Sequence, residues 1–336
     1  MRLKDFDYKL PEELVAQTPL AQRDSARLMV VNKAGRTITH DSFANIGKYL
    51  PPQSLIVMNN SKVVPARLFG NKTRSGGKVE LFLLKKLSDG FCYEILMRPQ
   101  KKIKDGDKIT FKGSRLVAHI ISKEKKIVRF NKKNILSYLE QVGHIPLPPY
   151  IKRPDNKKDR QYYQTVFARH AGSVAAPTAG LHFTKELLGD LRHCGHATAQ
   201  VTLHINYATF KPVECDDITA HPMHFEEYTL SQNVYDKISL AKKEKRPIVA
   251  VGTTSCRVLE TVVKEKRLKG RTNLYIYPGY DFKAVDALIT NFHLPCSTLL
   301  MLVYTLGGIK LMQKAYREAI KHKYRFYSYG DAMIIR

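Results

Sequence analysis

The sequence predicts an α/β protein in which a main, barrel-like α/β domain carries an inserted small β-barrel. From residue 197 to the C-terminus, apolar runs of strand length alternate with segments of helical period, as expected for helices packed over a sheet. Residues 62–130 instead hold short strands at close spacing without a helical period, which is typical of a small barrel or sandwich. The residues before this stretch again mix both kinds of element. The β-rich stretch therefore interrupts a single α/β domain.

The main domain is assigned to residues 1–62 and 150–336. Its strands are expected at 27–32, 54–60, 197–205, 247–251, 273–277 and 287–292, with a terminal segment at 329–336. Its helices are expected at 231–243, 254–263, 297–306 and 310–322. Ser231 and Ser297 are the expected N-caps, because a serine hydroxyl can accept a hydrogen bond from the backbone N–H groups of the first turn.

The inserted β-barrel domain is assigned to residues 63–149. Two pairs of apolar strands flank tight turns, one at 88–90 and one at the Lys/Glu turn that precedes residue 127. A short helix is expected at 135–142, with Gly143 as its end, followed by an extended proline-rich return at 144–154. Residues 101–133 contain twelve lysines and arginines against three acidic residues. They form either a grip for a polyphosphate such as tRNA or a set of solvated turns.

The net charge bears on partners. The chain has 56 lysines and arginines against 30 acidic residues, a formal net charge of +26. Such a surface attracts polyanions, which means nucleic acid or an anionic membrane. The most apolar stretch, residues 285–306, carries Asp286, Asn291, His293 and Pro295, so it is not expected to span a bilayer. We expect no membrane contact.

The cellular location follows from what the termini and cysteines indicate. The first thirteen residues show no apolar signal segment. The five cysteines lie far apart, without the spacing of a zinc knuckle or a redox pair, and are expected to be free thiols in a reducing compartment. We therefore expect a cytoplasmic protein.

One candidate functional segment spans residues 175–188, where bends surround Thr178 and His182 before a helix that Thr184 can cap. A histidine at a helix N-terminus is biased toward the neutral form by the positive end of the dipole, so it can act as a base. The alternative is a helix-capping loop with a packed histidine.

Histidines also follow the predicted strand 197–205. His204 ends that strand, and His221 and His224 lie shortly after it with carboxylates nearby. Two histidines three residues apart can indicate zinc, but Pro222 lies between them and no matching cysteine or histidine pair exists. We therefore expect these two side chains to line a pocket or an interdomain contact.

Two further segments lead from an apolar strand into a helix. The first contains Gly252, Thr253, Thr254 and Ser255, and then Arg257 one turn into the helix. Backbone N–H groups at such a helix start bind carboxylate or phosphate, and arginine can add a bidentate partner. The glycine spacing of a Walker or dinucleotide loop is absent, and an ordinary capped helix is the alternative.

The second of these segments spans residues 288–300 and places Asn291 and His293 at the end of a strand. At the C-terminus, residues 324–331 combine four aromatic side chains with basic residues before Asp331. Aromatic residues among arginines and lysines can stack on bases, although a C-terminal core strand explains them nearly as well.

Together these segments resemble the S-adenosylmethionine:tRNA ribosyltransferase-isomerase family of the queuosine pathway. The similarity extends across essentially the whole chain. Its most distinctive strings are GSVAAPTAGLHFT (172–184), HPMHFEEY (221–228), VAVGTTSCRVLE (249–260) and LITNFHLPCSTLLMLV (288–303). Others span residues 14–31, 59–68, 76–84, 143–153, 162–168, 275–283 and 325–335.

The resemblance implies a fold and a reaction. The fold is an α/β domain with an inserted β-barrel, and the partners are tRNA and S-adenosylmethionine. The ribosyl group of S-adenosylmethionine is moved to the aminomethyl arm of 7-aminomethyl-7-deazaguanine at the wobble position. The sugar rearranges to the epoxycyclopentanediol of epoxyqueuosine, and adenine and methionine leave. S-adenosylmethionine is consumed as a substrate, no other cofactor and no metal is implied, and we expect a monomer.

For this chemistry we assign roles to the singled-out residues. Proton transfer is expected from the histidines, and Asp331 would balance the sulfonium or position the amine. The expected catalytic residues are His182, His204, His293 and Asp331. The expected substrate-binding residues are Arg27, Asn59, Arg67, Thr178, His221, His224, Gly252, Thr253, Thr254, Ser255, Arg257 and Asn291.

The chain departs from the family pattern at a few loop positions. Asn206 and Ala208 stand where glycines are usual, Pro52-Gln53 replaces a Gly-Asp pair, and Asn60 replaces an aspartate. Alanine tolerates a positive φ poorly, so the backbone of the loop at residues 206–210 is expected to differ.

Three alternatives compete with this interpretation. A Rossmann-type RNA methyltransferase needs a glycine-rich turn after its first strand, which residues 27–36 do not supply. A tRNA-guanine transglycosylase would need clustered cysteines for zinc, which the sequence lacks. A non-catalytic RNA-binding protein would explain the charge but not the histidine, asparagine and arginine residues in the strand-to-helix turns.

Overall fold

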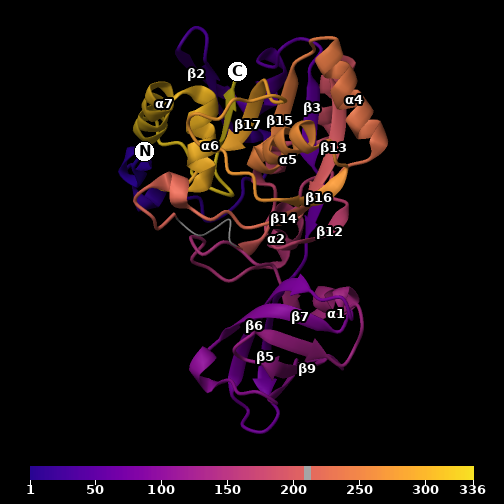
Figure 1. Cartoon of the computed structure of the whole chain (residues 1–336). Coiled ribbons are helices and arrows are strands. Elements are labelled where there is room, and N and C mark those ends of the chain that lie inside the picture. Colours follow the sequence, from indigo (N-terminus) through magenta and orange to yellow (C-terminus); the bar gives the residue numbers. More distant parts are fainter. Residues whose placement is uncertain (208–212) are drawn as a thin grey trace.

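A nine-stranded mixed sheet forms the centre of the computed structural model, which describes residues 1–207 and 213–336 (Figure 1). Across the sheet the strands are β16 (Lys269–Thr272), β14 (Glu226–Thr229), β13 (Ala197–Leu203), β3 (Leu55–Asn59), β15 (Ile248–Val251), β17 (Ala287–Asn291), β18 (Ala332–Ile335), β1 (Arg27–Asn32) and β2 (Thr37–Ser42). The sheet is open, with β16 and β2 at its edges, rather than closed like the barrel-like main domain that we expected.

The direction of the strands brings distant parts of the chain to one edge. Strands β13, β3, β15 and β17 run parallel. Strands β14 and β18 run antiparallel to their neighbours β13 and β17, so both begin where the parallel strands end. Residues that follow the four parallel strands, and residues that precede β14 and β18, therefore share the carboxyl edge of the sheet. Ligands of open α/β sheets bind at this edge.

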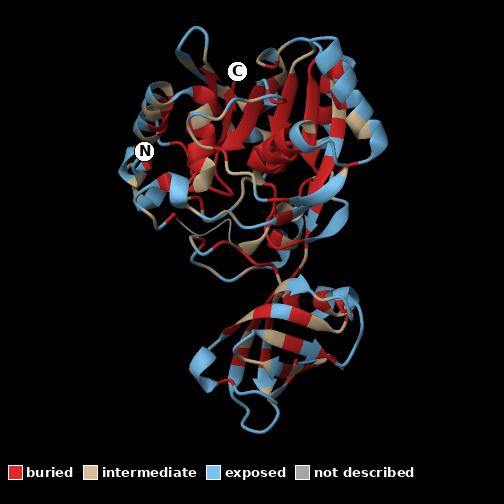
Figure 2. Ribbon diagram, viewed as in Figure 1, coloured by how far each residue is buried: buried red, intermediate tan, exposed pale blue. Residues whose placement is uncertain are grey.

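The central strands are buried on both faces, which explains their unbroken apolar sequences (Figure 2). On one face, residues such as Leu55 and Ile248 pack with α4 (Gln232–Lys243), α5 (Gly252–Glu265), α6 (Thr298–Gly307) and α7 (Ile309–Lys321). On the other face, Ile56 and Val249 pack with the short helix at Phe43–Lys48 and with α3 (Lys185–His193). Ser231, Ser297 and Thr184 cap their helices as predicted.

The inserted barrel is a separate all-antiparallel sheet below the main domain (Figure 1). Its strands are β5 (Arg67–Lys72), β6 (Lys78–Lys86), β7 (Cys92–Arg98), β8 (Lys108–Thr110), β9 (Val117–Ser122), β10 (Ile127–Phe130) and β11 (Gly143–His144). Six of them close into a ring because β5 pairs with β8, and β11 adds to β5. A Cβ at Gly70 would lie 2.7 Å from the Thr110 carbonyl oxygen, so this closure requires glycine.

Smaller elements join the two parts. The helix α1 (Leu136–Val142) ends at Gly143 as predicted. Strands β4 (Ser61–Val63) and β12 (His170–Ser173) pair in parallel where the chain passes between the sheets, and α2 (Lys157–Tyr162) follows the proline-rich segment. The α/β class and the inserted β-barrel are confirmed. In residues 1–207 and 213–336, no helix combines the length and apolarity needed to cross a membrane.

The strand expected at residues 273–277 is wrong, because the edge strand β16 ends at Thr272. After Thr272, hydrogen bonds between side chains and the Leu274 backbone replace the strand-to-strand hydrogen bonds. The Leu274 N–H donates to Thr272 Oγ1, at 3.1 Å, and the Leu274 carbonyl accepts from Arg257 Nε, at 2.9 Å. Residues 274–276 thereby become part of a cavity wall.

Candidate active site

Two adjoining cavities lie at the carboxyl edge of the sheet and share Thr253, Thr254 and Leu299. The larger cavity has a volume of about 290 Å³, and the smaller one about 70 Å³. Beyond the shared residues, the polar and aromatic side chains of the larger cavity are Asn206, Glu214, Cys215, His221, His224, Glu226, Arg257, Tyr275 and Thr298. Those of the smaller cavity are Tyr150, Thr178, Thr290, Asn291, Phe292, His293, Tyr327 and Ser328.

The start of α5 forms the boundary between the two cavities. Gly252 has a φ of 83°, a conformation that glycine adopts without strain, and it turns the chain from β15 into the helix. The residue before it, Val251, supplies no side-chain cap, so the first-turn N–H groups are available to a ligand. Thr253 and Thr254 line both cavities. Ser255 does not, because its hydroxyl donates to the Val251 carbonyl, at 2.7 Å.

Arg257 is buried in the wall of the larger cavity and forms an ion pair with Glu226. Its Nε also donates to the Leu274 carbonyl. Glu226 in turn accepts from the backbone N–H of Asn206, at 3.1 Å. Arg257 was expected to bind an anion, but in this structure its charge is balanced by Glu226. The pair joins α5 to the start of β14 and fixes this wall.

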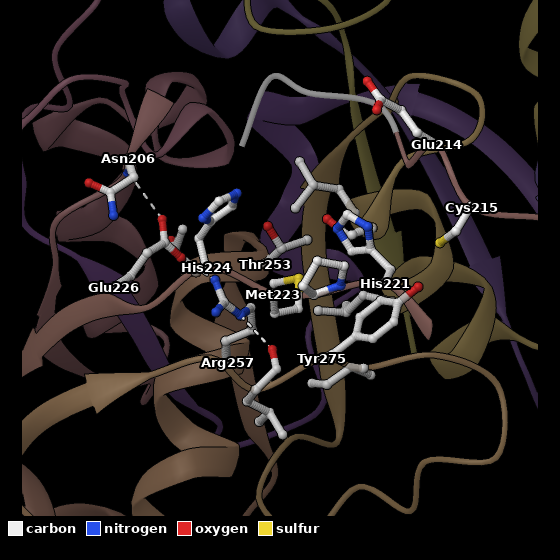
Figure 3. A pocket seen from close by; sticks show the side chains of 17 residues that line it. Asn206, Glu214, Cys215, His221, Met223, His224, Glu226, Thr253, Arg257 and Tyr275 are labelled. Atoms are coloured by element: carbon white, nitrogen blue, oxygen red, sulfur yellow. Dashed lines mark hydrogen bonds and ion pairs between the residues drawn. The ribbon is translucent and has the colours of Figure 1, made fainter. Parts of the chain in front are cut away.

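The two histidines that the sequence singled out both line the larger cavity, and His221 lies on the wall opposite Arg257. Figure 3 shows Asn206, Glu226 and Arg257 on one side, with Cys215, His221 and Tyr275 on the other. Burial lowers the pKa of His221, the charge of His224 lowers it further, and Glu214 opposes both. The His221 ring packs edge-on against Tyr275, with 5.8 Å between centroids. His221 is therefore biased toward the neutral form.

Asn291 lines the smaller cavity and carries a buried acceptor without a partner among the described residues. Its Nδ2 donates to the Tyr327 carbonyl, at 3.1 Å, and to His182 Nε2, at 3.2 Å. Both of its N–H bonds are then used. Its Oδ1 is buried and has no partner among the described residues. An unpaired buried acceptor is costly, so this oxygen is matched to a ligand that donates an N–H or O–H.

His293 lines the same cavity from the end of β17. Burial lowers its pKa to about 3, so its imidazole is neutral at ordinary pH. Its Nε2 is 2.7 Å from Thr290 Oγ1, and its backbone N–H donates to the Tyr316 hydroxyl, at 3.0 Å. The ring is held in place and can exchange a proton with a ligand.

His182 lies behind Asn291 rather than in either of these cavities. Burial is the main reason that its pKa falls to about 4, and the charges of Arg23 and Arg325 add to this effect. The expected neutral imidazole is therefore present, but its cause is burial more than a helix dipole. Through Nε2 it holds the Asn291 amide.

Two of the expected catalytic residues lie outside both cavities. His204 is partly buried, 2.8 Å from Ser61 Oγ, and it packs on Gly172, where a Cβ would come within 2.9 Å of the ring. Asp331 is buried, and burial raises its pKa. Its two oxygens accept from the backbone N–H groups of Arg27 and Arg325, at 3.0 and 2.8 Å. Asp331 thus joins the starts of β1 and β18.

Three expected binding residues also have other partners. The Arg27 guanidinium lies over the Tyr324 ring, 3.9 Å from its centroid. Asn59 joins β3, β13 and α5 through bonds to the Leu203 backbone and the Thr254 hydroxyl. Arg67 lies 3.2 Å from Glu80, in a separate cavity of about 250 Å³ between the barrel and residues 147–151. Ala208, one of the expected loop departures, lies outside the described residues.

Sequence reasoning missed several cavity residues. Tyr275 was placed in a strand, and Tyr150 in a linker. Met223 was passed over between the two histidines, and Glu226 was not matched to Arg257. The strings 143–153 and 275–283 contain the two tyrosines and were already recognised as family motifs, so they were the available signal.

Comparisons with known proteins show the family to which the chain belongs. The sequence model of a family described as "Queuosine biosynthesis protein" matches residues 3–335. The chain is 50% identical to the S-adenosylmethionine:tRNA ribosyltransferase-isomerase of a Sulfurihydrogenibium species, and 45% identical to the protein of the same name from Clostridioides difficile. Each alignment covers 100% of both chains. A crystal structure of S-adenosylmethionine tRNA ribosyltransferase from Thermotoga maritima is 36% identical, with a TM-score of 0.58, and covers 99% of this chain and 100% of its own.

Proposed function

Because this chain belongs to the queuosine biosynthesis protein family, we propose that it is an S-adenosylmethionine:tRNA ribosyltransferase-isomerase. It transfers the ribosyl group of S-adenosylmethionine to 7-aminomethyl-7-deazaguanine at the tRNA wobble position and isomerises it. The products are epoxyqueuosine-tRNA, adenine and methionine. The observation that carries this assignment is the full-length identity to enzymes of that name. The paired cavities at the carboxyl edge of the sheet supply a matching site.

We place S-adenosylmethionine in the larger cavity, with its carboxylate against the first turn of α5. The N–H groups of that turn and the hydroxyls of Thr253 and Thr254 are donors, and the helix dipole favours a negative charge there. Arg257 acts indirectly, because Glu226 already balances its charge. It positions the wall against which the substrate packs.

The smaller cavity suits the aminomethyl arm of the modified base. At about 70 Å³ it is too small for a second nucleoside and large enough for a short arm. Asn291 Oδ1 accepts an N–H of the amine. A desolvated site disfavours the ammonium form, so the amine is presented neutral, as attack on the sugar requires.

We assign proton transfer to His293, because it lines the smaller cavity. His182 and His204 line neither the larger nor the smaller cavity. Its low pKa keeps the nitrogen free to accept a proton. The same low pKa makes it a weak base, so we expect its contribution to lie toward the lower end of the ~10²–10⁴-fold range of general base catalysis. His182 acts as a positioning residue through Asn291.

The inserted domain, residues 63–149, is proposed to contact tRNA. Residues 101–133 carry most of its positive charge, and the cavity at Arg67 lies at its junction with the main domain. We further propose that the chain acts as a cytoplasmic monomer and that its chemistry needs no metal. The sulfonium itself acidifies the neighbouring C–H bond, so the reaction does not require a Lewis acid.

A product assay tests the proposal. The full chain is incubated with S-adenosylmethionine and tRNA that carries 7-aminomethyl-7-deazaguanine. We expect adenine and methionine to be released in equal amounts, together with the mass of epoxyqueuosine in the tRNA. S-adenosylhomocysteine would indicate a methyltransferase, and an exchanged base would indicate a transglycosylase. Binding of tRNA without any product would indicate an RNA-binding protein.

A further inference from the structure

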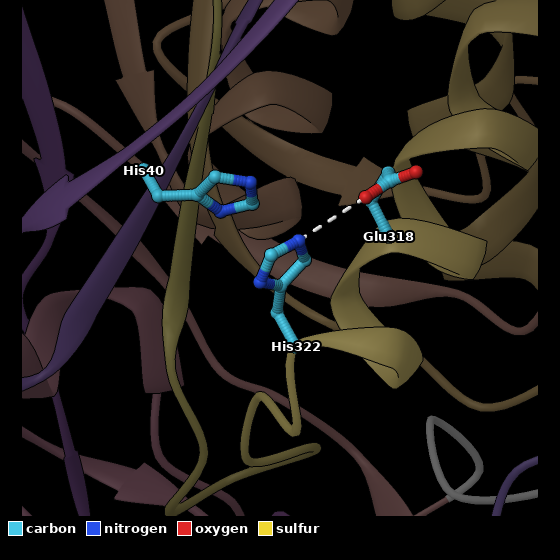
Figure 4. A group of neighbouring side chains, drawn as sticks. All are labelled: His40, Glu318 and His322. Carbon is cyan, nitrogen blue, oxygen red and sulfur yellow. Dashed lines mark ion pairs between the residues drawn. The ribbon is translucent and has the colours of Figure 1, made fainter.

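Two histidines and a glutamate from opposite ends of the chain meet at the β2 edge of the large sheet. His40 belongs to β2, Glu318 to α7, and His322 is the residue that ends α7 (Figure 4). One ligating atom of each lies within 4.8 Å of the others. His322 Nε2 is 3.3 Å from Glu318 Oε2, and the two imidazole rings are 4.6 Å apart between centroids. Among the described residues, no other three histidine, cysteine or carboxylate side chains lie close enough together to share an ion.

A hydrogen-bond chain fixes the His40 ring. The Tyr324 hydroxyl lies 2.8 Å from His40 Nδ1 and 3.4 Å from the Leu28 carbonyl oxygen. When the hydroxyl donates its single proton to Leu28, it accepts from Nδ1–H, and the lone pair of Nε2 is left for a ligand. Metal-binding histidines are held in this manner, with one nitrogen hydrogen-bonded and the other on the ion.

The surroundings of His40 also favour its neutral form. Burial lowers the pKa of His40, and the charges of His322 and Arg27 lower it further, whereas Glu318 opposes them. Two protonated imidazoles at this separation would repel each other. Arg27, which donates to the His322 carbonyl at 2.6 Å, opposes any bound cation and limits its affinity.

We propose that His40, Glu318 and His322 bind a divalent transition-metal ion, for which zinc is the best match. Two imidazole nitrogens and one carboxylate oxygen are a zinc ligand set, with water as the fourth ligand. Ligand atoms in a tetrahedral zinc site lie roughly 3.4 Å apart, given metal–ligand distances of ~2.0–2.2 Å. The separation between His322 and Glu318 already matches this value, and the His40 nitrogen, within 4.8 Å of both other ligand atoms, would move closer on binding.

The site lies away from the proposed active site and does not depend on it. Strand β2 is at one edge of the large sheet, whereas β14 and β16, beside the larger cavity, are at the other. A bound ion would link the edge strand β2 to the last helix, which are 282 residues apart at His40 and His322. Because the ion would bind the folded chain only, it would raise the melting temperature in a concentration-dependent manner.

The test uses the full chain, stripped of metal with a chelator and titrated with zinc ions by calorimetry. We expect one ion per chain and a melting temperature that rises with zinc concentration. His40→Gln and His322→Gln are each expected to weaken binding at least tenfold and to abolish the rise. These side chains are exposed, so the metal-free variants should melt as the parent chain does.

Two further variants serve as controls. His193→Gln changes another exposed histidine near the end of a helix and should leave zinc binding unchanged. A His221→Gln/His224→Gln variant tests the other close pair. Zinc binding that survives both His40→Gln and His322→Gln, or that is lost only in the His221/His224 variant, would overturn the proposal. So would the absence of any stoichiometric binding to the parent chain.

Discussion

The carboxyl edge of the large sheet and the inserted barrel differ in where they place polar groups. No polar or charged residue between 67 and 144 is buried, and the ion pairs of the barrel, such as Arg129–Asp89, lie near the surface. At the carboxyl edge, Arg257, Glu226, Asn291 and His293 are all buried. One region interacts with its surroundings through exposed charge, and the other through fixed, desolvated groups. The difference supports the proposal that the barrel contacts tRNA and that the carboxyl edge performs the chemistry.

The largest effect should come from the smaller cavity. His293→Asn is expected to lower the turnover number by roughly 10²-fold, the lower end of the range for general base catalysis, because it removes a proton acceptor of low pKa. The Michaelis constant for S-adenosylmethionine should change little. The dependence of the rate on S-adenosylmethionine concentration gives both constants, and the melting temperature shows whether the variant is folded. His204→Asn is the control, since His204 lies outside both cavities. A greater loss of turnover in His204→Asn than in His293→Asn would move the reaction away from these cavities.

The second prediction compares ion pairs in the two regions. Arg257→Met should destabilise the fold by about 3–5 kcal/mol, because it leaves the buried Glu226 uncompensated. Arg129→Met in the barrel should cost about 0–1 kcal/mol, since the side chains of that pair are 49% and 40% exposed. Urea unfolding measures both. The double variant Arg257→Met/Glu226→Gln should recover part of the loss. Equal costs at the two sites would contradict the contrast between the regions.

The third prediction concerns pH. His182 has a folded-state pKa of about 4, below its ordinary value of 6.5, so the unfolded chain binds the extra proton first. Its neutral form therefore stabilises the fold fully above pH 6.5, and this contribution is lost as the pH falls toward 4. The loss is on the order of 3 kcal/mol. His293 adds a similar dependence that extends to lower pH.

The measurement is unfolding free energy between pH 4 and 7 for the parent chain and for His182→Gln. We expect the variant to be less stable at pH 7 but to depend less steeply on pH. The exposed His193→Gln variant should keep the parent slope. If His182→Gln shows the same dependence of unfolding free energy on pH as the parent chain, other groups cause the acid sensitivity.

Several elements that form the candidate site could be predicted because they follow local rules. Apolar runs identified β15 and β17, and the turns after them were singled out as candidate sites. Because the structure pairs these strands in parallel, Gly252, Asn291 and His293 meet at one edge. Serine and threonine caps depend on a few neighbouring residues and were correct. The apolar runs and the caps require no knowledge of distant pairing.

What could not be predicted depends on long-range partners. Arg257 meets Glu226 only because β14 folds back beside β13, so the sequence could not show that its charge is balanced. Asp331 resembles a catalytic acid in sequence, yet it holds the backbones of Arg27 and Arg325. The contact between His40 and His322 depends on β2 lying beside the end of α7. In each case the partner is remote along the chain.

The smallest effect should come from the barrel. Lys101, Lys102 and Lys104 are exposed on it and are expected to contact tRNA phosphates. Each phosphate contact contributes a slope of roughly −0.7 to −0.9 to the dependence of log affinity on log salt. Replacing the three lysines with alanine should make this slope less negative, by at most the contribution of about three phosphate contacts. The affinity for S-adenosylmethionine should stay the same, because that ligand is assigned to the main domain.

A matched control separates a specific contact from general charge. Lys237, Lys242 and Lys243 are exposed on α4, at the end of the main domain farthest from the barrel in Figure 1. Replacing them with alanine removes the same charge. If the barrel grips tRNA, the salt slope should change in the barrel variant and not in the α4 variant. Equal changes would mean that the net charge of +26 attracts tRNA without a defined site, and the barrel's lysines would then be solvated turns.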